Sequence, residues 1–233
     1  MIFRLTILLL ISFLVARGMA EEEEQKPERP AVTKIGEHRY RLGKIEFDAK
    51  NREIFSPVTG KMREGGPIEY VLVHENGKIH ESVFTTKISP FHLQVAMKLL
   101  KFKAGEGDIF NRLLAPEFLE KEGGVEADRG DAVVVQYLEA GKEDRIPAAE
   151  TVIDGGGAEP MSDEPWVFTG SVMEGGTFMA ETEGSIIAIY LDRGSLLNMS
   201  REGADLDDRW GANSKAIPET GVKGTIILSP AKK

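Results

Sequence analysis

Histidine is the residue type with the clearest chemical potential in this sequence, because three of the four histidines lie close together, at positions 74, 80 and 92. The imidazole ring transfers protons near neutral pH and, when neutral, ligates metals. His80 is followed directly by Glu81 and Ser82, which add a carboxylate and a hydroxyl group. The sequence therefore offers one candidate polar site, for a metal or for proton transfer, made of His80, Glu81, Ser82 and His92.

The register of the surrounding strands decides which histidines can act together. The pattern predicts a β-hairpin with strands Ile68–His74 and Ile79–Thr85 around a two-residue Asn76-Gly77 turn. In that register His74 and His80 lie on opposite faces of the sheet, because successive strand residues alternate. A three-residue loop would instead pair the two histidines directly and permit joint metal binding.

His92 belongs to a predicted helix that follows the N-cap residue Ser89 and runs from Pro90 to about Phe102. The polar positions of this helix fall in one narrow sector: Gln94, Lys98 and Lys101. His92 lies in the opposite, apolar arc, and we expect it to face the sheet. It is then either a core histidine hydrogen-bonded to a carbonyl or carboxylate group, or the partner of His80 in a small polar site.

Other motifs give less support for chemistry. An acidic cluster at Asp205, Asp207 and Asp208 offers carboxylates for calcium, but it lacks the glycine and the distal glutamate of an EF-hand loop, which favours a solvated turn. His80 does not begin a zinc-protease motif, because Phe84 stands where the second histidine is required. The sequence also lacks a serine-hydrolase elbow, a P-loop and a Rossmann fingerprint. These observations favour a non-catalytic protein without deciding the question.

Composition excludes further classes of function. The chain has no cysteine and a formal net charge of −9 at pH 7. Cysteine nucleophiles, thiolate zinc sites and Cys-ligated iron–sulfur clusters are therefore impossible, and we expect no cofactor. An acidic chain without a basic stripe is unsuited to nucleic acid or to anionic membrane surfaces. The expected partner is an envelope protein or a small ligand.

Residues 1–20 have the pattern of a secretory signal peptide. Arg4 supplies the positive charge, Leu5–Val15 the apolar run, and Gly18-Met19-Ala20 the small residues before cleavage. The alternative is a retained anchor, but such a run covers about 16 Å as a helix, roughly half of a bilayer core. We therefore expect export to the periplasm or the extracellular space, without stable membrane insertion after cleavage. Residues 21–30 predict a disordered acidic leader.

The remaining residues, 31–230, predict a strand-dominated α+β single domain of β-hairpins, with one principal amphipathic helix packed on the sheet. Alternating residues before Pro57 predict a first hairpin whose second strand ends at that proline. The apolar run AVVVQYL at 132–138 predicts a buried strand. A glycine-rich stretch at 154–160 marks a possible subdomain boundary.

The segment GKIHESVFTTKISPFHLQVAMKLL, residues 77–100, resembles the YdjY-type domain of bacterial exported proteins, in which a Gly-Lys-x-His-Glu-Ser strand precedes a proline-led, leucine-rich helix. PWVFTGS at 165–171 and ETEGSIIAIYLD at 181–192 are similar to the C-terminal blocks of that family. The resemblance spans about residues 40–230. It implies an exported protein without an established reaction, and the ferredoxin-like label of some relatives cannot describe an iron–sulfur protein here.

The expected function follows from these observations together. We expect an exported, soluble, YdjY-like protein that serves as a non-catalytic binding or structural module of the cell envelope. The alternative is a metal-binding protein or metal-dependent enzyme that uses His80 and His92.

Overall fold

The computed structural model of this chain describes residues 31–106, 129–155 and 159–232. The predicted signal peptide at 1–20 and acidic leader at 21–30 lie outside the described residues. Ala31–Lys233 form one compact unit, while the possible subdomain boundary at 154–160 stays a prediction. None of the described helices is both long and apolar enough to cross a membrane.

Alternating burial directs the longest strands toward a shared interior. In β4 (Glu53–Gly60) every second residue is buried: Ile54, Ser56, Val58 and Gly60. The strand β7 (Ala132–Glu139), predicted from its apolar run, repeats this pattern: Val133, Val135 and Tyr137. Period-two burial is what a sheet produces when one of its faces covers a core. The Phe84 ring stacks on Tyr137 with centroids 4.5 Å apart, so aromatic rings help to fill this interior.

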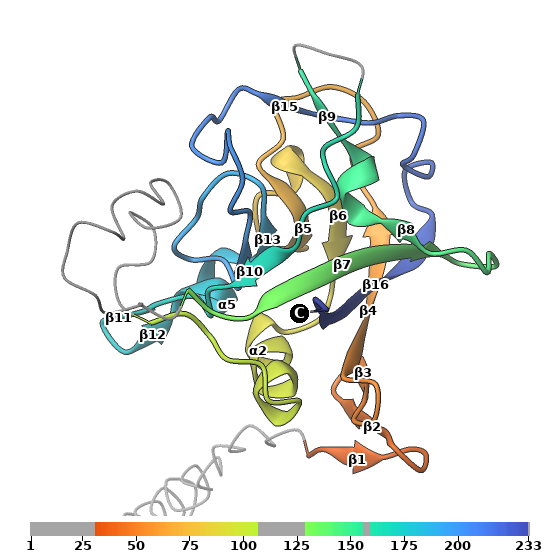
Figure 1. The fold of residues 1–233 in the computed structure, drawn as a ribbon, viewed down its shortest axis with the longest axis vertical. Coiled ribbons are helices and arrows are strands. Elements are labelled where there is room, and N and C mark those ends of the chain that lie inside the picture. The colour runs from red at the N-terminus through yellow and green to blue at the C-terminus, as the bar shows by residue number, and fades with distance from the viewer. Residues whose placement is uncertain (1–30, 107–128, 156–158, 233) are drawn as a thin grey trace, which may run out of the picture. The chain divides into compact units, whose positions relative to one another are not determined.

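Eight strands close into a β-barrel (Figure 1). Their order around the barrel is β4, β16 (Lys223–Pro230), β7, β10 (Trp166–Phe168), β14 (Leu197–Asn198), β13 (Ser185–Ala188), β5 (Tyr70–His74) and β6 (Ser82–Thr86). The barrel closes because β6 pairs with β4, at Thr59 with Thr85 and at Gly60 with Phe84. The prediction of a strand-dominated fold is confirmed, and the sheet is closed on itself.

Two neighbouring pairs of barrel strands are parallel, which corrects the predicted hairpin. β5 pairs with β6 in parallel, with Tyr70 opposite Ser82, so the two-residue turn at Asn76-Gly77 does not join antiparallel strands. The chain instead turns back at Gly77 and passes through the short helix η1 (Ile79–Glu81) before β6 begins. β13 and β14 form the second parallel pair, with Ile187 opposite Leu197.

Other strands extend the barrel or form small sheets of their own. Beyond β4 the sheet continues with three further strands, which pair in the order β3 (Ile45–Asp48), β2 (Arg39–Leu42) and β1 (Thr33–Lys34). β8 (Ile146–Pro147) pairs with β7 and leads into the short helix η2 (Ala148–Thr151). The two small sheets pair β9 (Val152–Asp154) with β15 (Trp210–Ala212), and β11 (Met173–Glu174) with β12 (Thr177–Phe178).

The first predicted hairpin is present as β3 and β4, but its second strand does not end at Pro57. The turn between the strands is held by Asp48, whose Oδ1 accepts the backbone N–H groups of Lys50 and Asn51. Pro57 lies inside β4 and its carbonyl accepts a hydrogen bond from Thr86 Oγ1. A strand residue directs its N–H and C=O to the same side, so the missing proline N–H costs β4 no bond to β16.

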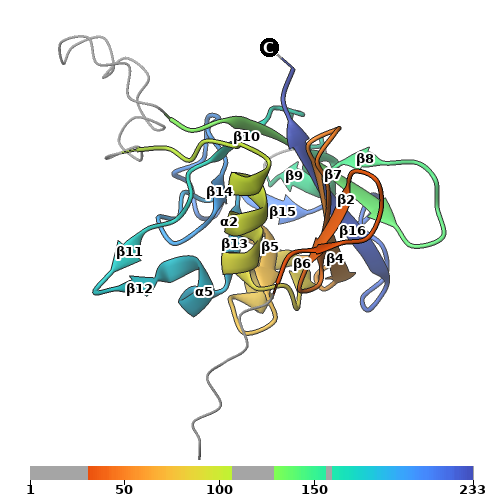
Figure 2. The ribbon, with the colours of Figure 1, turned by 90° about the horizontal axis from the view of Figure 1, so that it is seen from below.

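The predicted helix is α2 (Pro90–Leu99), which ends a few residues before the expected Phe102. Ser89 caps it, because its Oγ accepts the backbone N–H of His92. Its buried residues are Pro90, Leu93, Ala96 and Met97. Figure 2 shows that α2 lies across one end of the barrel, next to the short helix α5 (Met179–Glu183). The helix therefore covers the core at a barrel end instead of lying on an open sheet.

Candidate functional site

The structure does not bring His80 and His92 together. His80 is exposed in η1, which precedes β6, whereas His92 lies on α2, which follows β6. The His92 ring is half-buried over Gly43 in the turn between β2 and β3, where a Cβ on Gly43 would lie 2.8 Å from His92 Nδ1. The expectation that His92 points inward is met in part, because the ring covers a turn at the edge of the core.

The other predicted site residues do not form one polar site. Ser82 is fully buried and its Oγ donates to the carbonyl of Phe84 at 2.7 Å. Glu81 faces Lys78, at 3.6 Å between Oε2 and Nζ. Three aspartates that were candidates for calcium are exposed: Asp205, Asp207 and Asp208. Among residues 31–106, 129–155 and 159–232, no three His, Asp or Glu side chains form a group that could hold a metal ion.

A pocket of about 520 Å³ lies elsewhere, where two connections of the barrel meet. One is the connection between β5 and η1, and the other is the stretch from α5 through β13 to the residues before β14. The residues that line this pocket are almost all polar: Tyr70, Asn76, Gly77, Lys78, Thr182, Glu183, Ser185 and Asp192. Small-molecule sites are concave and usually lined mainly by apolar side chains with a few placed polar groups, so this polar lining suits a small polar ligand.

Two glycines allow the connections to come this close. A Cβ on Gly77 would lie 2.8 Å from the Glu183 carbonyl oxygen, and a Cβ on Gly184 would lie 3.0 Å from the Gly77 backbone. Gly184 also ends α5 in the left-handed conformation, with φ of 73°, which favours glycine. The backbone N–H of His74 donates to the Gly184 carbonyl at 2.7 Å, which ties β5 to the start of β13.

Tyr70 and Asp192 form a fixed pair in the pocket wall. The Tyr70 hydroxyl donates to Asp192 Oδ2 at 3.0 Å, and the Gly194 N–H donates to Asp192 Oδ1 at 2.7 Å. Burial, together with the charge of Asp192, raises the pKa of Tyr70 above its usual value, so the phenol stays protonated. The Asp192 backbone is held in turn by the fully buried Asn198, whose Oδ1 accepts its N–H at 2.8 Å.

Lys78 brings a positive charge that the protein itself neutralises. Its Nζ lies 2.8 Å from Glu69 Oε2 and 3.6 Å from Glu81 Oε2, and 5.4 Å from the centre of the Tyr70 ring. Burial alone would lower the pKa of Lys78, but the hydrogen bond to Glu69 and the nearby acidic groups outweigh it and raise this pKa. Lys78 therefore remains positively charged and forms ion pairs with Glu69 and Glu81.

Glu183 is exposed, and it differs from the other charged residues of the pocket because its carboxylate has no hydrogen bond or ion pair with any residue the structure describes. Burial, followed by the charges of Asp192 and Glu174, raises the pKa of Glu183, and Lys78 opposes this shift. Gly194 separates the two carboxylates. A Cβ there would clash with Glu183 Oε2 and lie 3.2 Å from Asp192 Oδ1. The pocket thus presents one unpartnered acceptor beside a second, fully hydrogen-bonded carboxylate.

Sequence reasoning missed all of these residues because they come from distant parts of the chain. Tyr70 and Asp192 are 122 positions apart, and Tyr70, Lys78 and Glu183 match no catalytic or metal-binding motif. Lys78, Glu183 and Asp192 lie in segments that resemble the YdjY-type domain, but that resemblance assigns them no role. The local features that could have pointed to this region are Gly184 and Gly194, which allow the pocket segments to approach each other closely. A glycine alone, however, does not indicate a binding site.

Comparison of this chain with protein-family models, with curated proteins and with solved structures found no match. The resemblance to the YdjY-type domain therefore stays a prediction.

Proposed function

We propose that this protein is an exported, non-catalytic module of the cell envelope that binds a small polar ligand in the pocket between Tyr70 and Glu183. The single observation that carries the proposal is the state of the pocket's charged groups. Tyr70, Lys78 and Asp192 are fixed by partners within the protein, whereas the Glu183 carboxylate is left open toward the pocket. A prearranged wall with a free acceptor favours binding, since few side chains must be ordered when the ligand arrives.

Binding has more support than catalysis because of what the lining groups can do. Tyr70 holds its proton firmly, and its hydroxyl already donates to Asp192, so it is a poor general acid or base. Ser185 lines the pocket beside Tyr70 and has no histidine among the described lining residues to activate it. These groups support recognition through hydrogen bonds.

A screen of small metabolites by protein-observed NMR tests the proposed function. We expect binding compounds to shift the backbone amide signals of Gly77, Ser185 and Gly194 together. Thr182→Trp places an indole in the pocket from an exposed position on α5 and should abolish these shifts.

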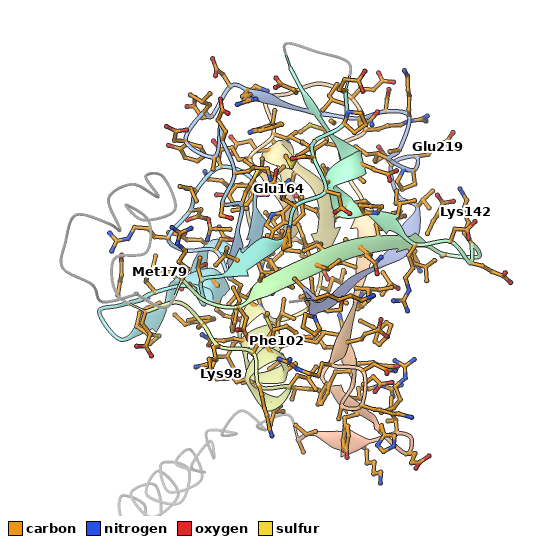
Figure 3. All side chains as sticks on the ribbon, viewed as in Figure 1. Lys98, Phe102, Lys142, Glu164, Met179 and Glu219 are labelled. Carbon is orange, nitrogen blue, oxygen red and sulfur yellow. The ribbon has the colours of Figure 1, made fainter. Side chains whose placement is uncertain are left out.

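The matched control is Glu143→Trp. Glu143 is exposed and follows Lys142 at the tip of the β7–β8 connection, across the barrel from Met179, the first residue of α5 (Figure 3). This variant should bind as the parent does. A library without binders, or binding that survives Thr182→Trp, contradicts the proposal.

The metal-binding alternative with His80 and His92 has less support, since the two residues lie at opposite ends of β6. Elemental analysis of protein purified without a histidine tag tests it directly. Stoichiometric zinc, copper or iron that is lost in His92→Gln would favour this alternative over ligand binding at Tyr70. We expect no bound metal and no change in thermal stability on adding these ions.

A further inference from the structure

We infer that the ligand of the Tyr70 pocket presents a primary ammonium group, which the Glu183 and Asp192 carboxylates receive together. This inference rests on the proposed function and names the chemical class of the ligand. It is carried by the arrangement of the charged groups that face the pocket from the three segments around it.

The two carboxylates converge on one point of the pocket wall. Because Gly194 has no side chain, Glu183 Oε2 and Asp192 Oδ1 both border the space that a Cβ there would occupy. Like charges held this close repel each other, and the raised pKa of Glu183 agrees with that repulsion. A cation between the carboxylates would relieve the repulsion. A neutral hydroxyl group would donate to one carboxylate oxygen but would leave the repulsion between the two charges unchanged.

The protein does not supply this cation from its own described residues. Lys78 is the basic residue that lines the pocket, and it is engaged by Glu69 at 2.8 Å and by Glu81 at 3.6 Å. Glu174 adds a further negative charge near Glu183. The local charge of the pocket therefore stays negative even though a lysine stands in its wall, which favours a positively charged ligand.

An ammonium group suits the site better than a metal ion. Calcium takes six to eight oxygen ligands, and magnesium demands octahedral geometry. Glu183 and Asp192 are the two carboxylates among the described residues that line the pocket, and no third His, Asp or Glu joins them, so the site offers too few oxygens for either metal. Each Asp192 oxygen accepts one hydrogen bond, from Gly194 N–H or from the Tyr70 hydroxyl, and can accept a second from an ammonium group. A primary ammonium group needs three acceptors, which Glu183, Asp192 and the Asn76 side chain or a water molecule can provide.

The experiment uses a pair of probes that differ in charge but not in length. Putrescine and 1,4-butanediol are titrated separately into the full mature protein, and the amide signals of Gly77, Ser185 and Gly194 are followed by NMR. We expect putrescine to shift all three signals with saturation, and 1,4-butanediol at the same concentrations to leave them unchanged. Glu183→Gln should weaken putrescine binding roughly tenfold or more, while Glu143→Gln should not change it.

Each other outcome overturns the inference, and the failures are distinguishable. If 1,4-butanediol binds as well as putrescine, the pocket binds a ligand and the ammonium class is wrong. If calcium chloride shifts the same signals more strongly than putrescine, the site prefers a metal ion. If putrescine binds Glu183→Gln as tightly as the parent, general acidity accounts for the binding. If neither probe nor any compound of the metabolite screen reaches the pocket, the proposed function fails as well.

Discussion

Tyr70 and Tyr137 show how the surroundings of one hydroxyl group decide its effect on stability. Both side chains are almost fully buried. The Tyr70 hydroxyl donates to a carboxylate, whereas the Tyr137 hydroxyl has no hydrogen-bond partner among the described residues. Replacement of each by phenylalanine removes the same atom, but we expect only the Tyr70 variant to lower the free energy of unfolding at pH 7.

Tyr70→Phe should lower the free energy of unfolding by about 1 kcal/mol at pH 7, because Asp192 Oδ2 loses its donor in a half-buried position. Urea denaturation followed by circular dichroism measures the change. Tyr190→Phe is the matched control, since no described hydrogen bond uses the Tyr190 hydroxyl. Equal effects of the two substitutions would argue against the Tyr70–Asp192 bond.

Tyr137→Phe should leave stability at pH 7 unchanged or raise it by up to about 1 kcal/mol, because no hydrogen bond is lost and an unpaired polar group leaves the core. Burial and the charge of Glu139 raise the pKa of Tyr137 to about 12. The folded protein therefore holds this proton more tightly than the unfolded chain, so stability falls as pH rises from about 10 toward 12. Urea midpoints measured between pH 8 and 11.5 should fall less steeply in the variant; an identical slope would contradict this.

At the scale of elements, the pocket depends on two connections that approach each other at glycines. The connection after β5 carries Lys78 into the wall, and the end of α5 carries Glu183. Gly77 and Gly184 form the contact between them. A parallel pair of neighbouring strands normally needs a long crossover. Here β5 and β6 are joined by a short return through η1, which places the return beside α5.

Gly77→Ala should separate these connections, because the added Cβ would meet the Glu183 carbonyl oxygen at 2.8 Å. We expect a loss of about 1–3 kcal/mol in the free energy of unfolding, together with weaker binding of any pocket ligand. Gly211→Ala is the control, since the nearest atom to its Cβ would be 3.6 Å away. Calorimetry and the NMR titration check both effects. A Gly77 variant as stable as the control would contradict the close contact.

At the scale of the whole molecule, closure of the barrel depends on strands from both ends of the chain. β16 lies between β4 and β7 and pairs with both along most of its length. Ile226 is opposite Ser56 on one side and Tyr137 on the other, so one row of inward side chains crosses three strands. Gly224, on the same strand, lets the Tyr137 ring pass over its backbone.

Gly224→Ala should destabilise the barrel by about 1–3 kcal/mol, because its Cβ would lie 2.7 Å from the Tyr137 hydroxyl oxygen and still closer to its ring. A double-mutant cycle tests the cause. In a Tyr137→Leu background the ring is gone, so the alanine should cost less than in the parent, although its Cβ would still lie 2.8 Å from the Leu138 carbonyl oxygen. Equal costs in both backgrounds, measured by urea denaturation, would show that the ring is not what excludes the methyl group.

Elements with local signals could be read from the order of the amino acids. Alternating residues marked the hairpin of β3 and β4, and an apolar run marked β7, because both patterns lie within single strands. Ser89-Pro90 marked the start of α2 because the cap and the fixed proline φ act within a few residues. The absence of cysteine likewise excluded thiolate chemistry without any fold. Strand dominance followed from the same local patterns.

The pairing of the strands and the place where the polar groups converge could be known only from the fold. Asn76-Gly77 is a turn signal in either arrangement, so it does not specify the parallel pairing of β5 with β6; each of these strands also pairs with a strand distant in sequence, β5 with β13 and β6 with β4. The same holds for the pocket: Tyr70 meets Asp192 across 122 positions. Such contacts form only when the barrel closes. Burial and electrostatic interactions join residues that are close in space, whereas a sequence motif shows only residues that are close along the chain. For that reason His80 and His92, which are near each other in the sequence, do not form a joint site in the fold. The pocket is lined instead by residues from distant segments: Tyr70, Lys78, Glu183 and Asp192.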